Sequence, residues 1–392
     1  MIPYGRQTIS KSDIDAVVNV LRSDFLTQGP IVHKFEATVS EYCGSKYAVA
    51  SNSATSALHL ACLALGLGPG DYLWTTPNTF VASANCGLYC GAEIDFVDID
   101  AKTFNMCPAK LEQKLKKASR KNTLPKIVIP VHYGGDPCNM PAIHSLSIKY
   151  GFKIIEDASH AIGAKDGQIS VGACVYSDIT VFSFHPVKII TTGEGGMALT
   201  NSAYLAEKMN LLGNHGIIKH KSPVLKGPEN EIWNYQQREL GFNYRMSDIA
   251  AALGLSQLEN LENFISKRSE IAVVYDSHFK NLPIQLRSWG IKSKPSYHLY
   301  NILINENEKN ITQSDVYQHL HKYKIGANIH YIPIHLQPFF NKYGFRRGDF
   351  PESEKFFKNT VSLPIYPDLL LKDQKTVIDS IVELFNGENS FA

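Results

Sequence analysis

Residues 180–197 read TVFSFHPVKIITTGEGGM, and they place a single lysine between two apolar strands. The first strand is expected to end near Ser183, and the chain turns at Pro186 before several glycines lead into the second strand. Lys188 stands in this turn among apolar neighbours. Because an ammonium group loses hydration in such surroundings, its pKa falls, and a neutral amine is what Schiff-base chemistry requires. A lone lysine in a turn is more often a solvated surface residue, so the prediction of a reactive lysine depends on the surrounding motif.

Short apolar strands alternate with helices on both sides of this stretch. Seven strands are expected, at residues 47–51, 73–76, 94–97, 126–132, 153–156, 179–184 and 196–200. Helical patterns fall between most of them. Such alternation is typical of an α/β domain whose mostly parallel sheet is covered by helices on both faces.

The pattern changes after about residue 215. Residues 219–240 are polar and predict a long surface loop, and residues 247–265 predict one long helix. Short strands and helices then alternate to the end, as in a smaller α+β domain. Because 392 residues suffice for two domains, we expect a large domain with an N-terminal arm at residues 1–250 and a small domain at residues 251–392.

Composition excludes several classes of protein. Hydrophobic residues make up 44% and charged residues 19% of the chain, which excludes a disordered protein. With 39 Lys and Arg against 37 Asp and Glu, the formal charge of +2 gives no general attraction to nucleic acid or to an anionic membrane. The N-terminus lacks the features of a signal peptide, and seven scattered cysteines without metal-ligand spacing fit reduced thiols. We expect a cytoplasmic enzyme with no nucleic-acid or membrane partner and no metal site.

Residues 154–160, IIEDASH, form a second informative element, because an apolar strand here delivers Glu156, Asp157 and His160 at its end. Ligands of open α/β sheets bind beyond the carboxyl ends of the strands. A carboxylate at that place can hold a proton on a heterocyclic nitrogen. Asp157 could equally serve as a helix N-cap.

Two further elements suit a phosphate and a planar ring. Residues 52–57, NSATSA, follow a strand and open a helix, whose free N–H groups and positive end favour an anion. Ordinary N-capping is the commoner role of such residues. Phe80 follows another strand, where its ring could cover a cofactor, although most such phenylalanines belong to the core.

Pyridoxal 5′-phosphate (PLP) requires four groups of a protein: a lysine for a Schiff base, a carboxylate for the ring nitrogen, a helix end for the phosphate and an aromatic ring as a cover. Seven motifs then extend the pattern over nearly the whole chain: LTQGP (26–30), NSATSAL (52–58), TFVASAN (79–85), EDASHAIG (156–163), SFHPVK (183–188), GEGGM (193–197) and GFNYRMSDIAAALGLSQL (241–258). In these motifs the chain resembles the DegT/DnrJ/EryC1/StrS sugar aminotransferases. The resemblance implies a fold-type I PLP transferase, with an aspartate-aminotransferase-like large domain.

The resemblance also implies a role for individual residues. Lys188 would be the Schiff-base lysine and the base that then moves a proton between substrate and cofactor, Asp157 would hold the pyridinium proton, and His160 would lie near the phenolic oxygen. Phe80 would stack on the ring. The phosphate contacts would come from Ala54, Thr55, Ser183 and, across a homodimer with shared active sites, Asn243. Five positions match those that line the sugar-nucleotide cleft: Tyr4, Leu26, Thr27, His330 and Tyr331.

The implied reaction transfers the amino group of L-glutamate to C4 of a UDP-linked 4-keto-6-deoxy-N-acetyl sugar. Residues 330–338, HYIPIHLQP, carry the similarity to family members with this acceptor. A transaminase for 4-amino-arabinose or for a 3-amino sugar is the alternative within the family, and a non-catalytic binding protein would lack Lys188 or Asp157. A dinucleotide-binding oxidoreductase is disfavoured, because residues 66–70, GLGPG, follow a helix and precede a strand, the reverse of a phosphate-binding loop.

Overall fold

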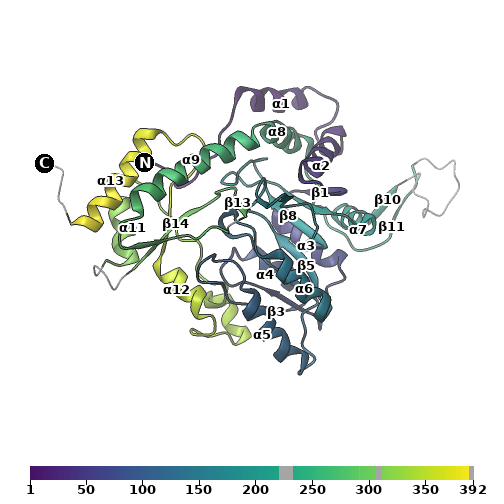
Figure 1. Ribbon diagram of the computed structural model, residues 1–392. Coiled ribbons are helices and arrows are strands. Elements are labelled where there is room, and N and C mark those ends of the chain that lie inside the picture. Colours follow the sequence, from purple (N-terminus) through teal and green to yellow (C-terminus); the bar gives the residue numbers. More distant parts are fainter. Residues whose placement is uncertain (220–232, 291, 306–310, 388–392) are drawn as a thin grey trace.

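A seven-stranded sheet forms the centre of the computed structural model, which describes residues 1–219, 233–290, 292–305 and 311–387 (Figure 1). The strand order is β1-β9-β8-β5-β4-β2-β3. The strands are β1 (Tyr47–Ser51), β2 (Tyr72–Thr75), β3 (Glu93–Phe96), β4 (Ile127–Ile129), β5 (Lys153–Asp157), β8 (Ile179–Ser183) and β9 (Gly196–Thr200). All neighbours from β3 to β8 pair in parallel, and β9 alone runs antiparallel to its two neighbours. The mostly parallel sheet that we predicted is therefore confirmed.

Helices cover both faces of this sheet, because consecutive residues of each buried strand point to opposite sides. Ile155 and Val181 pack with α3, α4 and α7 on one face, whereas Ile154 and Phe182 pack on the other face, with α5 and α6 and with α2 and α8, respectively. The helices are α2 (Pro30–Cys43), α3 (Ala54–Ala64), α4 (Ala82–Tyr89), α5 (Pro108–Ser119), α6 (Met140–Tyr150), α7 (Ala203–Gly213) and α8 (Asp248–Glu259).

The register of the strands brings several chain segments to one edge of the sheet. Ser51 at the end of β1 and Ser183 at the end of β8 both lie opposite Gly196, the first residue of β9. Asp157 at the end of β5 lies opposite Val181 in β8. The carboxyl ends of β1, β5 and β8 therefore meet, which is where an α/β sheet binds its ligand.

The single helix that we predicted over residues 247–265 is wrong. Two helices, α8 and α9 (Leu261–Phe279), meet at Asn260, whose backbone leaves helical geometry (φ −100°, ψ 2°). Asparagine has a weak helix preference because its side chain competes for backbone groups. The break lets α8 pack against α2 and against α1 (Lys11–Leu21), while α9 continues into the C-terminal part of the chain.

A second core forms after α9. It consists of an antiparallel sheet in the order β12-β14-β15, flanked by α9, α11 and α13. The bounds are β12 (Ile284–Leu286), β14 (Tyr300–Ile304), β15 (Thr360–Leu363), α11 (Gln313–Lys322), α12 (Pro351–Asn359) and α13 (Leu371–Asn386). The N-terminal arm joins this part, since Ile2 bridges to Ile325. The predicted domain boundary after residue 250 stays a prediction, and the packing of α8 favours a boundary inside α9.

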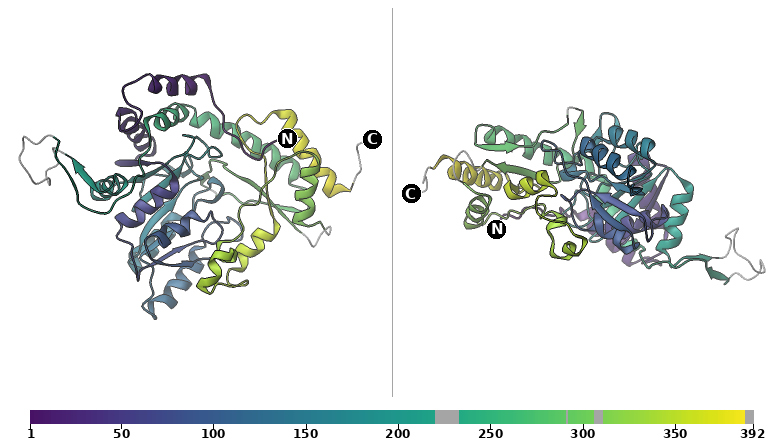
Figure 2. Two further views of the ribbon diagram at one scale, coloured as in Figure 1. Left: turned by 180° about the vertical axis from the view of Figure 1, so that it is seen from behind. Right: turned by 90° about the horizontal axis from the view of Figure 1, so that it is seen from below.

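Short elements complete the described chain. These are β6 (Lys165–Asp166), β7 (Ile169–Ser170), β10 (Ile217–Lys219), β11 (Tyr235–Gln237), β13 (Ser293–Lys294) and the 3₁₀ turns at Tyr133–Gly135, Ile334–Leu336 and Pro338–Tyr343. The hairpin of β10 and β11 projects from the side of the molecule (Figures 1 and 2). Most of the surface loop predicted at residues 219–240 lies outside the described residues.

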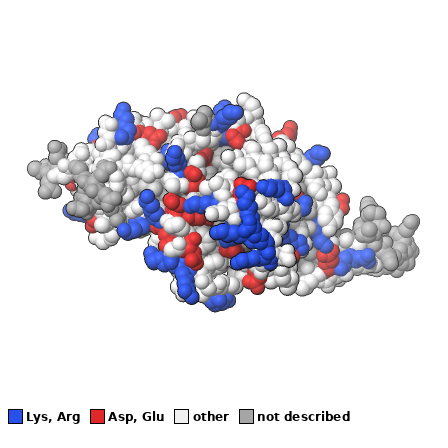
Figure 3. Space-filling view, turned by 60° about the horizontal axis from the view of Figure 1, so that its bottom comes forward, with Lys and Arg blue, Asp and Glu red and all other residues white. Residues whose placement is uncertain are grey.

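Basic and acidic side chains alternate on the side of the molecule that carries α5. Figure 3 turns this side forward and shows a broad patch of Lys and Arg side chains with Asp and Glu beside it. Lys110 pairs with Asp98 at 2.9 Å and Lys116 with Glu112 at 3.1 Å. Among the described residues, no helix combines the length and the apolar character needed to cross a lipid bilayer.

We expect Gly196→Ala to destabilise the protein by about 1–3 kcal/mol, because the added methyl group overpacks a fixed backbone. A Cβ at residue 196 would lie 2.4 Å from the backbone nitrogen of Ala54. Urea unfolding of the variant measures the loss. Gly68→Ala is the control, since a Cβ there meets no atom within 4 Å; equal stability of the two variants would contradict the prediction.

Candidate active site

The first turn of α3 forms one end of the site. Its N-cap is Ser53, whose Oγ accepts a hydrogen bond from Ser56 N–H at 3.1 Å, so Ala54 and Thr55 lie in the first turn. Gly196 passes directly beneath this turn, and a Cβ at residue 196 would overlap the backbone of Ser53 and Ala54. Ser183 lies across the sheet from Gly196. A helix end with free N–H groups beside a hydroxyl is suited to a phosphate.

Lys188 lies in the loop between β8 and β9, as predicted. Hydrogen bonds close this loop: Phe184 N–H donates to Gly195 O at 2.9 Å and Thr192 N–H to Phe184 O at 3.0 Å. Loss of hydration lowers the pKa of the Lys188 amine to about 8, although the Asp157 carboxylate acts in the opposite direction. A substantial part of the amine is therefore neutral near physiological pH.

Asp157 is buried at the end of β5 and accepts two hydrogen bonds. Ser83 Oγ donates to its Oδ2 at 2.6 Å, and Ser159 N–H donates to its Oδ1 at 3.1 Å. The hydroxyl of Thr79 lies 3.0 Å from that of Ser83. Turns rather than a helix follow Asp157, so the alternative role as a helix N-cap does not apply.

His160 is held as an uncharged imidazole. Gly134 N–H donates to its Nδ1 at 3.2 Å, so the neutral ring carries its proton on Nε2, which lies 3.1 Å from Tyr331 Oη. Burial, with the nearby Lys188 amine, holds the pKa of His160 well below its ordinary value. The Tyr331 ring stacks on the imidazole with an angle of 19° between their planes.

Phe80 presents its ring to the site instead of the core. The side chain is 58% exposed and its ring centre lies 6.4 Å from that of Tyr331. An exposed aromatic ring near Tyr331, which itself contacts His160, is suited to cover a planar cofactor.

The structure divides the predicted substrate residues into two groups. Tyr4, His330 and Tyr331 lie together, with 5.5 Å between the rings of Tyr4 and His330. Burial and the Lys188 charge lower the pKa of His330 to about 3, so this imidazole is also neutral. Leu26 and Thr27 are exposed on another element, where Leu26 O accepts a hydrogen bond from Asp248 N–H at 3.0 Å.

Asn243 is exposed on the segment beside the first turn of α3. Its backbone oxygen accepts a hydrogen bond from Asn52 Nδ2 at 3.4 Å, and it bridges to Asn214. The side chain thus stands at the surface next to the first turn of α3 of its own chain. Its predicted reach into a partner subunit stays a prediction.

Sequence reasoning missed several polar residues that the fold brings to the site. His298 lies with its ring 4.3 Å from that of His160, and its buried Nδ1 has no hydrogen-bond partner among the described residues. Both polar side-chain atoms of Asn78, two residues before Phe80, are buried and likewise find no partner in the described part of the chain. Unpartnered buried polar atoms are uncommon and fit a site that binds a polar ligand. Only the position of Asn78 beside Thr79 and Phe80 was a signal in the sequence.

These groups define a class of protein before any comparison is made. An α/β enzyme holds PLP with four groups: a desolvated amine, a buried carboxylate at the end of the neighbouring strand, a helix end and an exposed aromatic ring. The residues present fit this cofactor, and Gly196 lets the backbone of β9 approach the first turn of α3 closely.

Comparisons with known proteins agree with this class. The model of the DegT/DnrJ/EryC1/StrS aminotransferase family matches residues 7–382. A UDP-4-amino-4,6-dideoxy-N-acetyl-beta-L-altrosamine transaminase from Campylobacter jejuni is 39% identical over 388 residues, which cover 98% of this chain and 97% of that protein. The chain therefore belongs to the DegT/DnrJ/EryC1/StrS family and is a PLP-dependent sugar aminotransferase.

Solved structures show the same fold. PseC from Helicobacter pylori, an aminotransferase involved in the biosynthesis of pseudoaminic acid, superposes with a TM-score of 0.90 at 32% identity, covering 99% of this chain and 100% of that one. Spr1654 from Streptococcus pneumoniae, in its PLP-form, superposes with a TM-score of 0.87 at 28% identity and covers 98% and 99% of the two chains. The predicted fold class and the predicted cofactor are confirmed.

We expect the Lys188 amine of the cofactor-free protein to react with PLP at a rate that rises about tenfold per pH unit up to pH 8 and then levels off. With a pKa of about 8, roughly one amine in ten is neutral at pH 7, against fewer than about one in a thousand for an ordinary lysine. Growth of the cofactor's absorbance band measures the rate. A rate that still increases steeply between pH 9 and about pH 10, as for an ordinary lysine, would contradict the prediction.

Proposed function

We propose that this enzyme transfers the amino group of L-glutamate to C4 of a UDP-linked 4-keto-6-deoxy-N-acetyl sugar, and that it does so in the cytoplasm. The product would be UDP-4-amino-4,6-dideoxy-N-acetyl-β-L-altrosamine, for pseudaminic acid biosynthesis. The observation that carries the proposal is the 39% identity, over nearly the full length of both chains, to a transaminase named for this product. The similarity to PseC supports the same pathway.

Lys188 has the properties that a transaminase lysine needs. PLP, when bound, supplies an electron sink for the carbon that carries the amino group. With its lowered pKa, the neutral Lys188 amine would hold the cofactor and would be the base that accepts a proton from that carbon. Backbone hydrogen bonds close the loop and hold the main chain of Lys188 in place.

The other residues orient the cofactor. Asp157 remains available to hold a proton on the ring nitrogen, because Ser83 and Ser159 keep its carboxylate fixed. His160 offers an uncharged imidazole toward the phenolic oxygen, with its orientation set by Gly134 N–H. Phe80 covers the ring, and Ala54, Thr55 and Ser183 bind the phosphate. Tyr4, His330, Tyr331 and, from their separate element, Leu26 and Thr27 contact the sugar nucleotide.

We expect Lys188→Ala to lose the covalent cofactor band and at least about a thousand-fold in turnover, as expected when a covalent catalytic group is removed. Lys34→Ala, which removes an exposed lysine of α2, is the matched control and should keep full activity. A full cofactor band in Lys188→Ala would refute the assignment of this lysine.

A panel of 4-keto and 3-keto sugars linked to UDP or TDP tests the acceptor. Protein that has first reacted with glutamate should regain its original absorbance with the UDP-linked 4-keto-6-deoxy-N-acetyl sugar and not with the 4-keto-arabinose derivative. Recovery with a 3-keto sugar alone would replace the proposed acceptor and leave the enzyme class unchanged.

We further propose a homodimer in which Asn243 of one subunit binds the phosphate in the other. The Lys188→Ala and Asn243→Ala proteins, each inactive alone, are unfolded and refolded together. We expect about one quarter of wild-type activity to return. Half of the dimers are then mixed, and one of the two sites in each mixed dimer is intact. Size-exclusion chromatography of the refolded mixture checks that dimers have formed. Mixed dimers without activity would show that Asn243 acts within its own subunit.

A further inference from the structure

The peptide unit between Tyr133 and Gly134 lies between a charged side chain and the imidazole of His160. Its oxygen accepts a hydrogen bond from Arg287 Nη1 at 2.8 Å. Its N–H group, which belongs to Gly134, donates to His160 Nδ1 at 3.2 Å. Because electrons are delocalised over a planar amide, a charged donor on the oxygen makes the N–H group a stronger donor. Arg287 therefore acts on His160 without touching it.

The guanidinium of Arg287 is fixed on all sides. Arg287 follows β12 directly, and its side chain is only 3% exposed. Nη2 donates to Thr103 O at 2.6 Å and pairs with Asp136 Oδ2 at 3.3 Å, while the ring centre of Trp289 lies 4.8 Å from the guanidinium carbon. The planar fork of an arginine makes such contacts in one orientation only. Nη1 therefore stays directed at the oxygen of Tyr133.

The main chain around His160 is held by the same part of the chain that carries Arg287. Ser296 Oγ donates to His160 O at 2.7 Å, and His298 N–H donates to Gly134 O at 3.0 Å. A ring nitrogen that accepts a hydrogen bond carries no proton, so the neutral imidazole has its proton on Nε2. Nε2 lies 3.1 Å from Tyr331 Oη. The hydroxyl oxygen of Tyr331 therefore accepts this hydrogen bond, and its own hydrogen points elsewhere.

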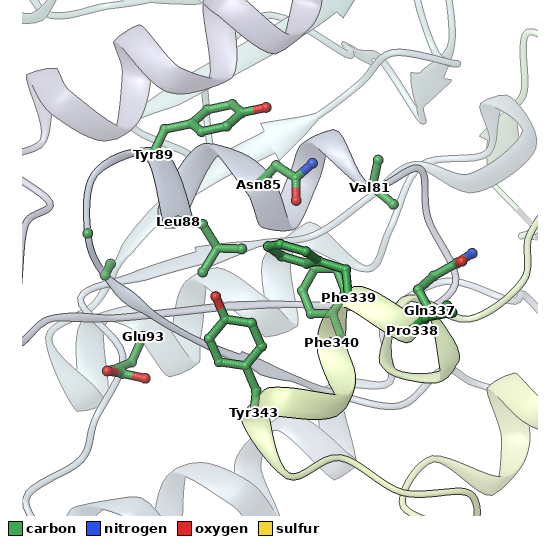
Figure 4. A pocket seen from close by; sticks show the side chains of 12 residues that line it. Val81, Asn85, Leu88, Tyr89, Glu93, Gln337, Pro338, Phe339, Phe340 and Tyr343 are labelled. Atoms are coloured by element: carbon green, nitrogen blue, oxygen red, sulfur yellow. The ribbon is translucent and has the colours of Figure 1, made fainter.

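The main chain next to Tyr331 is anchored on both sides. Tyr133 Oη donates at 2.6 Å to the oxygen of His330, the residue before Tyr331. In the 3₁₀ turn that comes after Tyr331, Phe340 is buried in the core that contains α3 and α4. Figure 4 shows this turn against α4, where Phe340 and Leu88 line a groove of about 820 Å³. Tyr133 thus contacts both Arg287, through its main chain, and the segment of Tyr331, through its hydroxyl.

We propose that Arg287 is a positioning residue for transamination, and that it acts through the Tyr133–Gly134 peptide. Its charge strengthens the N–H group that occupies His160 Nδ1, so the imidazole stays uncharged and keeps its proton on Nε2. Tyr331 Oη accepts the hydrogen bond from Nε2 and donates its own hydrogen to the bound substrate. The inference rests on the proposed function, in which His160 faces the cofactor and Tyr331 the sugar.

The groups around His160 decide the sign of the expected change. Burial is the main cause that holds the pKa of His160 well below its ordinary value, and nearby positive charges act in the same direction. The titratable and charged groups that face it are Lys188, His132, His298, His330, Arg287, Tyr133 and Tyr331. Loss of Arg287 removes one positive charge and also weakens the hydrogen bond to Nδ1. Both changes make the imidazole easier to protonate, so the pKa of His160 rises.

The test is nuclear magnetic resonance of the full-length holoenzyme, labelled with ¹⁵N in its 14 histidines. His160→Gln identifies the two ring signals of His160 by their loss. In the wild type we expect a protonated Nε2 and an unprotonated Nδ1 from about pH 8 down to about pH 6. In Arg287→Gln the Nδ1 signal should move toward the protonated position as the pH falls to about 6, and kcat should fall about tenfold. Arg287→Lys, which keeps the charge, should recover part of both.

Arg268→Gln is the matched control for loss of a buried arginine. Arg268 also donates to backbone oxygens, among them Ile365 O at 2.9 Å, but not to the Tyr133–Gly134 peptide, so the His160 signals should stay as in the wild type. Equal shifts in the two arginine variants, unchanged signals in Arg287→Gln, or a proton on Nδ1 of the wild type would each overturn the proposal. The wild-type spectrum needs no variant of Arg287, so misfolding of that variant does not remove the test. A wrong acceptor sugar leaves these signals as expected, so failure of the proposed function is seen separately.

Discussion

Removal of water from the Lys188 amine is the constraint on which the rest of this structure depends. Burial lowers the pKa of the amine to about 8, and the Asp157 carboxylate limits the shift. This balance holds only if the two groups keep their separation. The parallel pairing of β5 with β8 fixes Asp157 beside the strand that leads to Lys188, and the hydrogen-bonded loop after β8 fixes the backbone of Lys188.

Neutral imidazoles surround this amine, and they come from both parts of the chain. His160 follows β5 of the central sheet, whereas His298 and His330 come from the C-terminal part. Burial lowers the pKa of all three, and the Lys188 charge acts in the same direction. A positive charge on one of these imidazoles would lower the pKa of the Lys188 amine further. Because the imidazoles are neutral, they do not lower it in this way. The C-terminal part is therefore a component of the active site as well as a second core.

Local pattern predicted the elements that lie within one stretch of chain. The strands that end at Asp157 and Ser183 could be predicted because buried parallel strands are short apolar runs. The loop that contains Lys188 could be predicted from its glycines. The same reasoning failed at Asn260, where two helices meet, because the apolar periodicity continues through the break. Which helix packs against α1 and α2 is a tertiary contact that no local period records.

The sequence by itself determined the fold class and the places of Lys188, Asp157 and the first turn of α3 in their local elements, because each depends on residues close together along the chain. Only the tertiary structure decided that Tyr331 stacks on His160 and that Ser83 donates to Asp157. Those contacts join residues 171 and 74 positions apart. They exist only after strand register and helix packing have closed the intervening loops, and no spacing in the sequence encodes them.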